Sequence, residues 1–264
     1  MTCCPITRAD WERGAAHCLN KGRVGNARVY RLETATGTFV VKDFRKSPWW
    51  VRWTWGRWMI GHEFRLMRML EELPGVPSRV FRIDAYAFAM PFVKGWTLGE
   101  INQNNLQAWR ERMRGVEHPT KEIAIPVTYF RALERTVCAM HRRGIVHLDL
   151  RNAKNLIVTP GRVPVLLDFQ SGIRRQWWVP RWAWKILCLA DLSSVYKHYY
   201  HFYFMPGQGV PCISGGFPKS RDRLFLKHLK LRKLWMLKGY TFMHRRKPKD
   251  YEQALIDAAS GGGH

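Results

Sequence analysis

Strand-like runs of apolar residues dominate the first ninety residues of the chain. Residues 27–32 and 38–44 are rich in β-branched and aromatic side chains, and the turn-forming pair Thr36-Gly37 separates them. Similar runs occupy residues 80–83 and 86–93. We therefore expect four β-strands in this part of the chain.

One helical segment interrupts these strands. Between residues 58 and 73 apolar side chains recur at a helical spacing, as at Met67, Leu70 and Leu73. This spacing places them on one face of an α-helix. Pro74-Gly75-Val76-Pro77 then ends the periodicity. The first part of the chain is therefore predicted to be β-rich with one helix.

A helical pattern replaces the strand pattern beyond a linker at Lys94-Gly95-Trp96. Residues 129–143 are amphipathic and are followed by Gly144, which is typical of a helix end. Two short apolar runs, at residues 156–158 and 164–167, predict a further pair of strands.

We expect an α+β fold with two main parts and a tail. Residues 1–93 form the β-rich part in this interpretation. Residues 94–250 form a larger helical part that is basic from about Ile186 onward, and residues 251–264 form a flexible tail. No internal repeat is visible in the sequence.

Composition adds a strong positive charge to this picture. The 264 residues include 44 Lys and Arg against 20 Asp and Glu, which gives a formal net charge of +24, and 46% of the residues are hydrophobic. The hydrophobic fraction excludes a wholly disordered chain. The charge indicates a polyanionic partner, either nucleic acid, an anionic membrane surface or a phosphorylated substrate.

Targeting and cysteine patterns predict a cytoplasmic protein that does not span a membrane. The first residues lack the apolar core of a signal peptide, and no window of about 18 residues is uncharged and apolar. The six cysteines show no CxxC pair and no other metal-ligand spacing. This favours reduced structural thiols.

The residues most suited to catalysis gather between residues 144 and 170. A polar loop contains His147, Asp149 and Asn155, and Asp168 follows the second short strand. This order brings two carboxylates and one amide around a small volume. Phosphoryl transfer requires such a set, because one carboxylate orients the accepting hydroxyl while the other and the amide hold Mg²⁺ on the nucleotide phosphates.

Two of these segments resemble motifs of a known superfamily. His147-Leu148-Asp149-Leu150-Arg151 and Asp168-Phe169-Gln170 resemble the catalytic loop and the DFG segment of protein-kinase-like enzymes. With its small size and basic, Trp-rich composition, the chain is similar to the bacterial lipopolysaccharide kinase (Kdo/heptose kinase) family. The resemblance covers roughly residues 20 to 200. It implies a bilobal fold, with a small β-rich N-lobe that contains one key helix and a larger α-helical C-lobe.

The resemblance implies a role for each matched polar residue. Asp149 would be the catalytic base, and Arg151 would lie near the transferred phosphate. Asn155 and Asp168 would hold Mg²⁺. The usual loop has four residues between the Asp and the Asn, whereas five separate Asp149 from Asn155, so Asn152 is a rival metal ligand.

ATP would bind through residues of the β-rich part. Lys42 matches the lysine that contacts the α/β-phosphates, and Glu63 is its expected ion-pair partner. The remaining nucleotide contacts are expected in a degenerate glycine-rich loop and in the segment that joins the lobes: Gly22, Gly25, Met90 and Phe92.

Further residues of the motifs predict bracing and the absence of a switch. His147 is expected to be a buried structural imidazole, and Asp191 to brace the backbone of the catalytic loop. Gln170 replaces the DFG glycine, which reduces backbone freedom, and Leu148 replaces an arginine. We therefore expect neither a flipping segment nor control by a phosphorylated activation loop.

Nine of the 13 tryptophans lie in two short segments, residues 46–58 and 174–185, where Trp is interleaved with Arg and Lys. This composition is typical of contact with a membrane interface. The alternative is that the rings pack the two lobes together. The basic run at residues 219–249 suits a membrane surface and would equally suit nucleic acid.

These expectations describe a kinase that uses ATP and Mg²⁺ at the inner face of a bacterial cytoplasmic membrane, as a peripheral protein. The resemblance implies a sugar hydroxyl of a membrane-associated glycolipid, the lipopolysaccharide inner core, as the acceptor. An atypical Ser/Thr protein kinase is the first alternative, and a catalytically inactive basic module that docks on membranes or RNA is the second. The acceptor hydroxyl, the regulation and the oligomeric state are left open.

Overall fold

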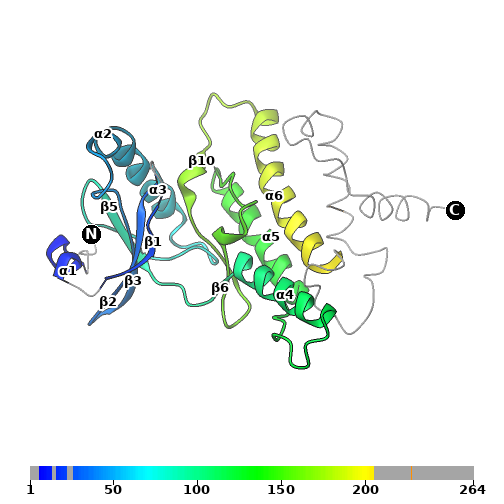
Figure 1. Cartoon of the computed structure of the whole chain (residues 1–264). Helices are drawn as coiled ribbons and strands as arrows, with labels where there is room; N and C mark the ends of the chain where they lie inside the picture. Colours follow the sequence, from blue (N-terminus) through cyan, green and yellow to red (C-terminus); the bar gives the residue numbers. More distant parts are fainter. Residues whose placement is uncertain (1–5, 14–15, 23–25, 205–226, 228–264) are drawn as a thin grey trace.

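A five-stranded antiparallel sheet occupies one end of the molecule, and helices make up most of the other end (Figure 1). The computed structural model describes residues 6–13, 16–22, 26–204 and 227. Within these residues the fold is mixed α+β, as the sequence predicts.

The strands of the large sheet follow the order β1-β2-β3-β5-β4. Their bounds are Ala16–Asn20 for β1, Arg28–Thr34 for β2, Gly37–Asp43 for β3, Phe81–Arg82 for β4 and Ala87–Pro91 for β5. The three longer predicted strands are confirmed with slightly different ends, and the run at residues 80–83 shortens to β4.

The turn between β2 and β3 sets the register of the sheet. Gly37 adopts a φ of 138°, a conformation that favours glycine, and it pairs with Thr34 at the start of the ladder. The ladder runs from there to Arg28 opposite Asp43. Sequence analysis missed β1, because this edge strand leaves nearly all of its residues exposed and so shows no alternation.

A long helical stretch packs beside the sheet. It begins with α2 (Trp49–Val51), continues through the π-helical turn η1 (Arg52–Gly56) and ends with α3 (Arg57–Leu70). The predicted helix at residues 58–73 is confirmed, but the helical stretch starts earlier and ends earlier. Gly56 lies against Phe44, where an added Cβ would come within 3.0 Å of the ring, so the widened turn brings the backbone close to the sheet.

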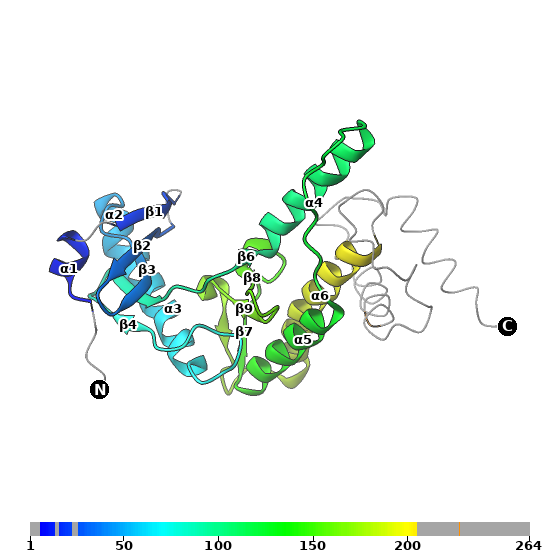
Figure 2. The ribbon, with the colours of Figure 1, turned by 90° about the horizontal axis from the view of Figure 1, so that it is seen from below.

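Three helices form most of the other end of the molecule. They are α4 (Leu98–Met113), α5 (Val127–Arg142) and α6 (Arg181–Phe204), and α4 projects away from the other two (Figure 2). The predicted helix at residues 129–143 is confirmed as α5. A box of reciprocal hydrogen bonds between Thr97 and Glu100 caps the start of α4.

Two small sheets lie between these helices and the large sheet. One has the order β6-β8-β9, with bounds Trp96–Thr97, Leu156–Val158 and Pro164–Leu166, and the other pairs β7 (Ile145–Val146) with β10 (Ile173–Arg174). The predicted pair of strands is thus confirmed as β8 and β9. Part of the expected linker forms β6 instead, because Trp96 and Thr97 pair with Val158 and Ile157.

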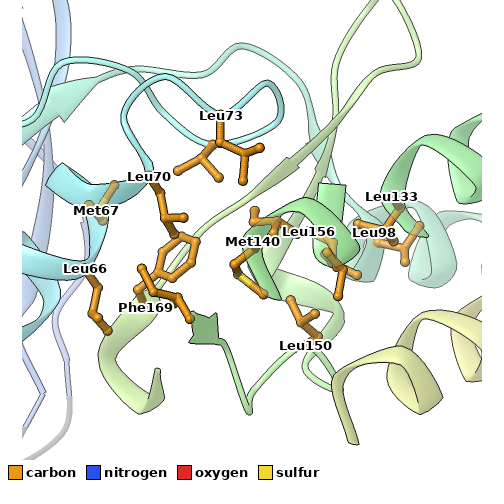
Figure 3. Close-up of a cluster of buried hydrophobic side chains, with 14 of the residues drawn as sticks. Leu66, Met67, Leu70, Leu73, Leu98, Leu133, Met140, Leu150, Leu156 and Phe169 are labelled. Atoms are coloured by element: carbon orange, nitrogen blue, oxygen red, sulfur yellow. The ribbon is translucent and has the colours of Figure 1, made fainter. Parts of the chain in front are cut away.

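A shared apolar core joins the two ends of the molecule. Phe169 is fully buried and lies between Leu66 and Leu70 of α3 on one side and Met140 of α5 on the other (Figure 3). Phe169 therefore anchors the adjacent Asp168 to both ends of the molecule.

Several expectations concern residues outside the described part of the chain. These are the contact at Gly25, most of the basic run at residues 219–249, and the tail at residues 251–264. Among the described residues, no helix is both long and apolar enough to cross a bilayer. Among the described cysteines, Cys18 is exposed and Cys138 and Cys188 are partly buried, and all three are free.

Candidate active site

A largely buried cluster of three charged side chains joins β3, α3 and Asp168, the second residue after β9. The Lys42 ammonium lies 2.6 Å from Glu63 Oε1 and 2.8 Å from Asp168 Oδ1. Lys42 comes from a central strand, and Glu63 from the buried face of α3. The structure therefore brings together the predicted Lys42–Glu63 pair and one predicted metal ligand.

Electrostatics keep the ammonium of this cluster charged. Burial acts to lower the pKa of Lys42, but attraction to Glu63 and Asp168 outweighs it and raises this pKa above its ordinary value. Burial likewise acts to raise the pKa of Asp168, but the nearby Lys42 ammonium dominates and lowers it. Lys42 and Asp168 are therefore both ionised at neutral pH.

Glu63 differs from Asp168 in its access to solvent. The side chain of Glu63 is fully buried, whereas that of Asp168 is 39% exposed. Burial raises the pKa of Glu63, although Lys42 opposes this shift. Glu63 Oε1 accepts hydrogen bonds from Lys42 and from the Phe169 N–H, at 3.1 Å. Glu63 therefore positions Lys42, and Asp168 is the carboxylate that a ligand can reach.

A second pair of polar side chains lies on the loop after β7. The Asn155 amide nitrogen donates to Asp149 Oδ2 at 2.8 Å and to the Asp149 carbonyl at 3.0 Å. The backbone carbonyl of Asn155 accepts from the Leu167 N–H at 2.8 Å, which ties this loop to the residue before Asp168. The Asp149–Asn155 pair and the cluster of Lys42, Glu63 and Asp168 are thus neighbours across the β8–β9 hairpin.

The structure separates the two candidate asparagines. Asn155 is buried beside Asp149, in the 3₁₀ turn η2 (Ala153–Asn155). Asn152 is exposed, and its side-chain oxygen accepts from the Lys154 N–H as the cap of that turn. The extra loop residue is accommodated by this turn. Asn152 contacts Asp149 only through its backbone N–H, whereas the side chain of Asn155 donates to the Asp149 carboxylate.

Asp191 holds the backbone at the start of the loop that follows β7. Its carboxylate is buried and accepts from the His147 N–H at 2.7 Å and from the Leu148 N–H at 2.8 Å. The side chain of His141 lies 3.1 Å from the same carboxylate. The expectation that Asp191 braces this backbone is therefore confirmed.

His147 is a buried structural imidazole, as expected. Its Nδ1 accepts from the Asp149 N–H at 3.3 Å, and its Nε2 lies 2.9 Å from the Leu167 carbonyl. Burial lowers the pKa of His147, although Asp191 opposes the shift. A neutral ring with its proton on Nε2 satisfies both contacts. Both nitrogens are occupied, so His147 is not a base for a substrate.

Two of the four non-glycine residues with a positive φ in the described part of the chain lie at this site. Leu148 has a φ of 63° and Asp168 a φ of 65°, in the left-handed region that side chains rarely adopt. Asp191 holds Leu148, and the buried ring of Phe169 in the 3₁₀ turn η3 (Phe169–Ser171) anchors the residue after Asp168. Strained residues persist where surrounding contacts fix them, and they cluster at functional sites.

The remaining predicted residues lie around these pairs with less definite contacts. Arg151 is exposed, two residues after Asp149. Gly22 has a φ of 66°, and its N–H donates to Asn20 Oδ1 at 2.9 Å. Met90 is buried in β5, and the Phe92 N–H donates to the Thr38 carbonyl at 2.9 Å. Phe92 cannot offer this N–H to a nucleotide while that bond holds.

Sequence analysis missed one residue that connects α3 to the segment after Asp168. His62 Nε2 lies 2.7 Å from the Gly172 carbonyl, and its ring stacks on Trp58 at 5.0 Å. Its neighbour Glu63 was identified from a motif, but no pattern near His62 indicates a partner 110 residues away in the chain.

The donor set suits a hard divalent cation. Among the described residues no group of three His, Cys, Asp or Glu side chains lies together as a metal site. Asp168 and Asn155 instead offer a carboxylate and an amide oxygen, because Asn155 uses its nitrogen for Asp149. Mg²⁺ is commonly held by one or two protein oxygens together with substrate phosphates and water. The residues present therefore fit Mg²⁺ brought with a nucleotide.

No protein-family model matches the chain, and no curated protein is significantly similar to it in sequence.

Proposed function

We propose that this protein is a protein-kinase-like phosphotransferase that uses ATP and Mg²⁺. The observation that carries the proposal is the buried Lys42 ammonium held between Glu63 and Asp168, next to the Asp149–Asn155 pair. This arrangement presents one cation, one reachable carboxylate and one further carboxylate on adjoining elements. Transfer of a phosphoryl group needs these three elements.

Lys42 would bind the α/β-phosphates of the nucleotide, and Glu63 would hold its ammonium in place. Asp168 and Asn155 would hold Mg²⁺, which neutralises charge on the phosphates when it is bound. The sheet end and the helical end would correspond to the two lobes. The adenine would hydrogen-bond to the backbone that joins them, between Met90 and Val93.

Asp149 would orient the accepting hydroxyl. Asn155 occupies one carboxylate oxygen of Asp149, which fixes the side chain and leaves the other oxygen to accept the hydroxyl proton. Arg151 is exposed and would contribute positive charge near the transferred phosphate. The backbone that carries both residues is braced by Asp191, so the base is held before substrate binds.

A sugar hydroxyl of a membrane-associated glycolipid is the acceptor that we propose, with the lipopolysaccharide inner core as the first candidate. Two observations support it: the resemblance of the 147–151 and 168–170 segments to lipopolysaccharide kinases, and the exposed tryptophans described below. The reaction would occur at the inner face of the cytoplasmic membrane.

Phosphate transfer from γ-labelled ATP to purified lipopolysaccharide core and to generic proteins tests the proposal. Asp149→Ala should lower transfer by about 10²- to 10⁴-fold, because general-base catalysis contributes this much. The same variant should retain ATP binding. Asp168→Asn should also be inactive, whereas Glu117→Gln, an exposed carboxylate in the loop after α4, should keep full activity.

Each outcome of this assay has a distinct meaning. Label on the core glycan that depends on Asp149 and Asp168 supports the glycolipid kinase. Label on protein alone would replace it by an atypical protein kinase. Absence of both label and Mg²⁺-dependent ATP binding would overturn the phosphotransferase and leave a basic docking module.

A further inference from the structure

Eight of the nine tryptophans in the two Trp-rich segments are exposed. The first tryptophan segment is residues 46–58 and the second is residues 174–185. The exposed fractions of the eight rings range from 48% for Trp55 to 94% for Trp177, and the other exposed rings are Trp49, Trp50, Trp53, Trp58, Trp178 and Trp182. Trp184 is the only buried tryptophan of the nine, so packing between lobes does not explain the other rings.

Both segments carry positive charge without any acidic residue. The first contains three Lys or Arg, the second contains four, and neither contains Asp or Glu; the cations are Lys46, Arg52 and Arg57 in the first segment and Arg174, Arg175, Arg181 and Lys185 in the second. Clusters of exposed apolar side chains on a monomer mark interaction surfaces. The charge restricts the partner to an anionic one.

A single junction holds the two segments together. His62, on α3 just after the first segment, stacks on Trp58 and lies 2.7 Å from the carbonyl of Gly172, just before the second segment. Gly172 itself packs so closely on Leu66 that an added Cβ would come within 2.8 Å of the leucine. Two segments that are more than a hundred residues apart in the sequence thus begin or end beside the same contact between His62 and Gly172.

The segments lie toward the same edge of the molecule. In Figure 1, α2 and the connection between β10 and α6 both occupy the upper edge. We propose that the two tryptophan segments form one face that docks on an anionic lipid bilayer. Indole rings bury their apolar body at the headgroup level, and the interleaved cations meet lipid phosphates.

The exposure of the rings favours a bilayer over single-stranded nucleic acid. A stacked base covers one face of an aromatic ring, whereas lipid surrounds a ring that stands out from the surface. Trp177, at 94% exposed, stands free on both faces. The helical turns of the first segment and the connection before α6 present their rings outward in this way.

Docking would bring the candidate active site to the membrane surface. The second segment begins at β10, which pairs with β7, and β7 leads directly into the loop of Asp149. An acceptor in the adjacent leaflet would thus reach Asp149. This placement rests on the proposed function, whereas docking itself does not.

Co-sedimentation of the full chain with phosphatidylcholine vesicles containing about one-third phosphatidylglycerol measures docking. The double variants Trp49→Ser/Trp50→Ser and Trp177→Ser/Trp178→Ser should each weaken binding on the order of tenfold. Trp96→Ser is the matched control, because Trp96 is 57% exposed but lies in β6, outside both segments. It should bind as the unmodified protein does.

Charge variants supply the second arm of the test. Arg181→Gln/Lys185→Gln should reduce binding to these vesicles by about fivefold per cation, whereas the exposed Arg131→Gln on α5 should have little effect. Undiminished binding of both tryptophan variants would overturn the proposal. The proposal would also be overturned if these variants lost binding to single-stranded RNA while their binding to vesicles stayed unchanged. Since no readout depends on ATP, failure of docking is distinguishable from failure of phosphate transfer.

Discussion

Two regions of the molecule reverse the usual placement of polar and apolar side chains. The charged cluster of Lys42, Glu63 and Asp168 lies largely inside, whereas the two tryptophan segments keep eight indole rings outside. Buried charge and exposed apolar surface are both unfavourable placements. Folds retain such placements mainly where they serve binding or chemistry.

The two regions differ in what holds them. Each member of the charged cluster has a partner on another element, so the cluster is part of the packing of the fold. Among the exposed rings, Trp55 contacts Trp58, three residues further along the chain, at 5.2 Å. We therefore expect changes in the cluster to affect stability and catalysis together, and changes in the rings to affect docking alone.

Removal of Lys42 should have the largest effect on stability. Lys42→Met leaves the fully buried Glu63 without a counter-charge, and loss of one partner of a buried ion pair costs about 3–5 kcal/mol. Chemical denaturation at neutral pH would measure this loss in the free energy of unfolding. A loss below about 1 kcal/mol would show that the cluster is not part of the packing.

A double variant and a pH series sharpen this prediction. Without Lys42, burial holds the pKa of Glu63 above its ordinary 4.5. The folded chain then binds more protons than the unfolded chain, so the stability of Lys42→Met should fall as pH rises above about 4.5. Lys42→Met/Glu63→Gln should be more stable than Lys42→Met at neutral pH. The explanation fails if the double variant is no more stable.

Asp191→Asn should have the second largest effect. The carboxylate accepts from two backbone N–H groups, and an amide would turn an NH₂ group toward one of them. We expect a loss of about 1–3 kcal/mol in the free energy of unfolding. Thermal denaturation would detect it, with the exposed Glu117→Gln as control. An unchanged midpoint would contradict the bracing role.

His147 should contribute a smaller, pH-dependent effect. Burial lowers its pKa in the folded protein below the ordinary 6.5, so the unfolded chain binds more protons as pH drops below about 6.5. Stability should therefore fall on acidification, by at most about 1.4 kcal/mol per pH unit from this residue.

His147→Gln should reduce the slope of stability against pH in this window, whereas the exposed His118→Gln should leave it unchanged. Urea denaturation across this pH range measures the slope. Equal slopes in His147→Gln and the unmodified protein would assign the acid sensitivity to other groups.

The sequence predicts residue identities better than it predicts their arrangement. The contact of Lys42 with Glu63 and the bracing by Asp191 follow from motif order, because these roles depend on a few residue types at fixed places. The choice between Asn152 and Asn155 needed the structure, since it depends on a 3₁₀ turn that accommodates one extra residue.

Other features leave no local pattern in the sequence. The left-handed conformations of Leu148 and Asp168 are imposed by tertiary contacts, not by their residue types. The bond from His62 to Gly172 joins positions that no periodicity relates. Composition alone also does not decide whether the tryptophans are exposed, because interleaved Trp and Arg suit packing as well as docking.

The exposed rings should have the smallest effect on stability, and the second tryptophan segment contains its own control. Trp177→Ser and Trp178→Ser should each change the free energy of unfolding by less than about 0.5 kcal/mol, because exposed side chains lose little contact on truncation. Trp184 is 8% exposed in the same segment, so Trp184→Ala should cost about 3 kcal/mol. Denaturation of the three variants in the absence of lipid makes the comparison. If Trp177→Ser or Trp178→Ser destabilised the fold as Trp184→Ala does, the rings would belong to the packing, and weaker vesicle binding by these variants would reflect unfolding instead of lost contact with lipid.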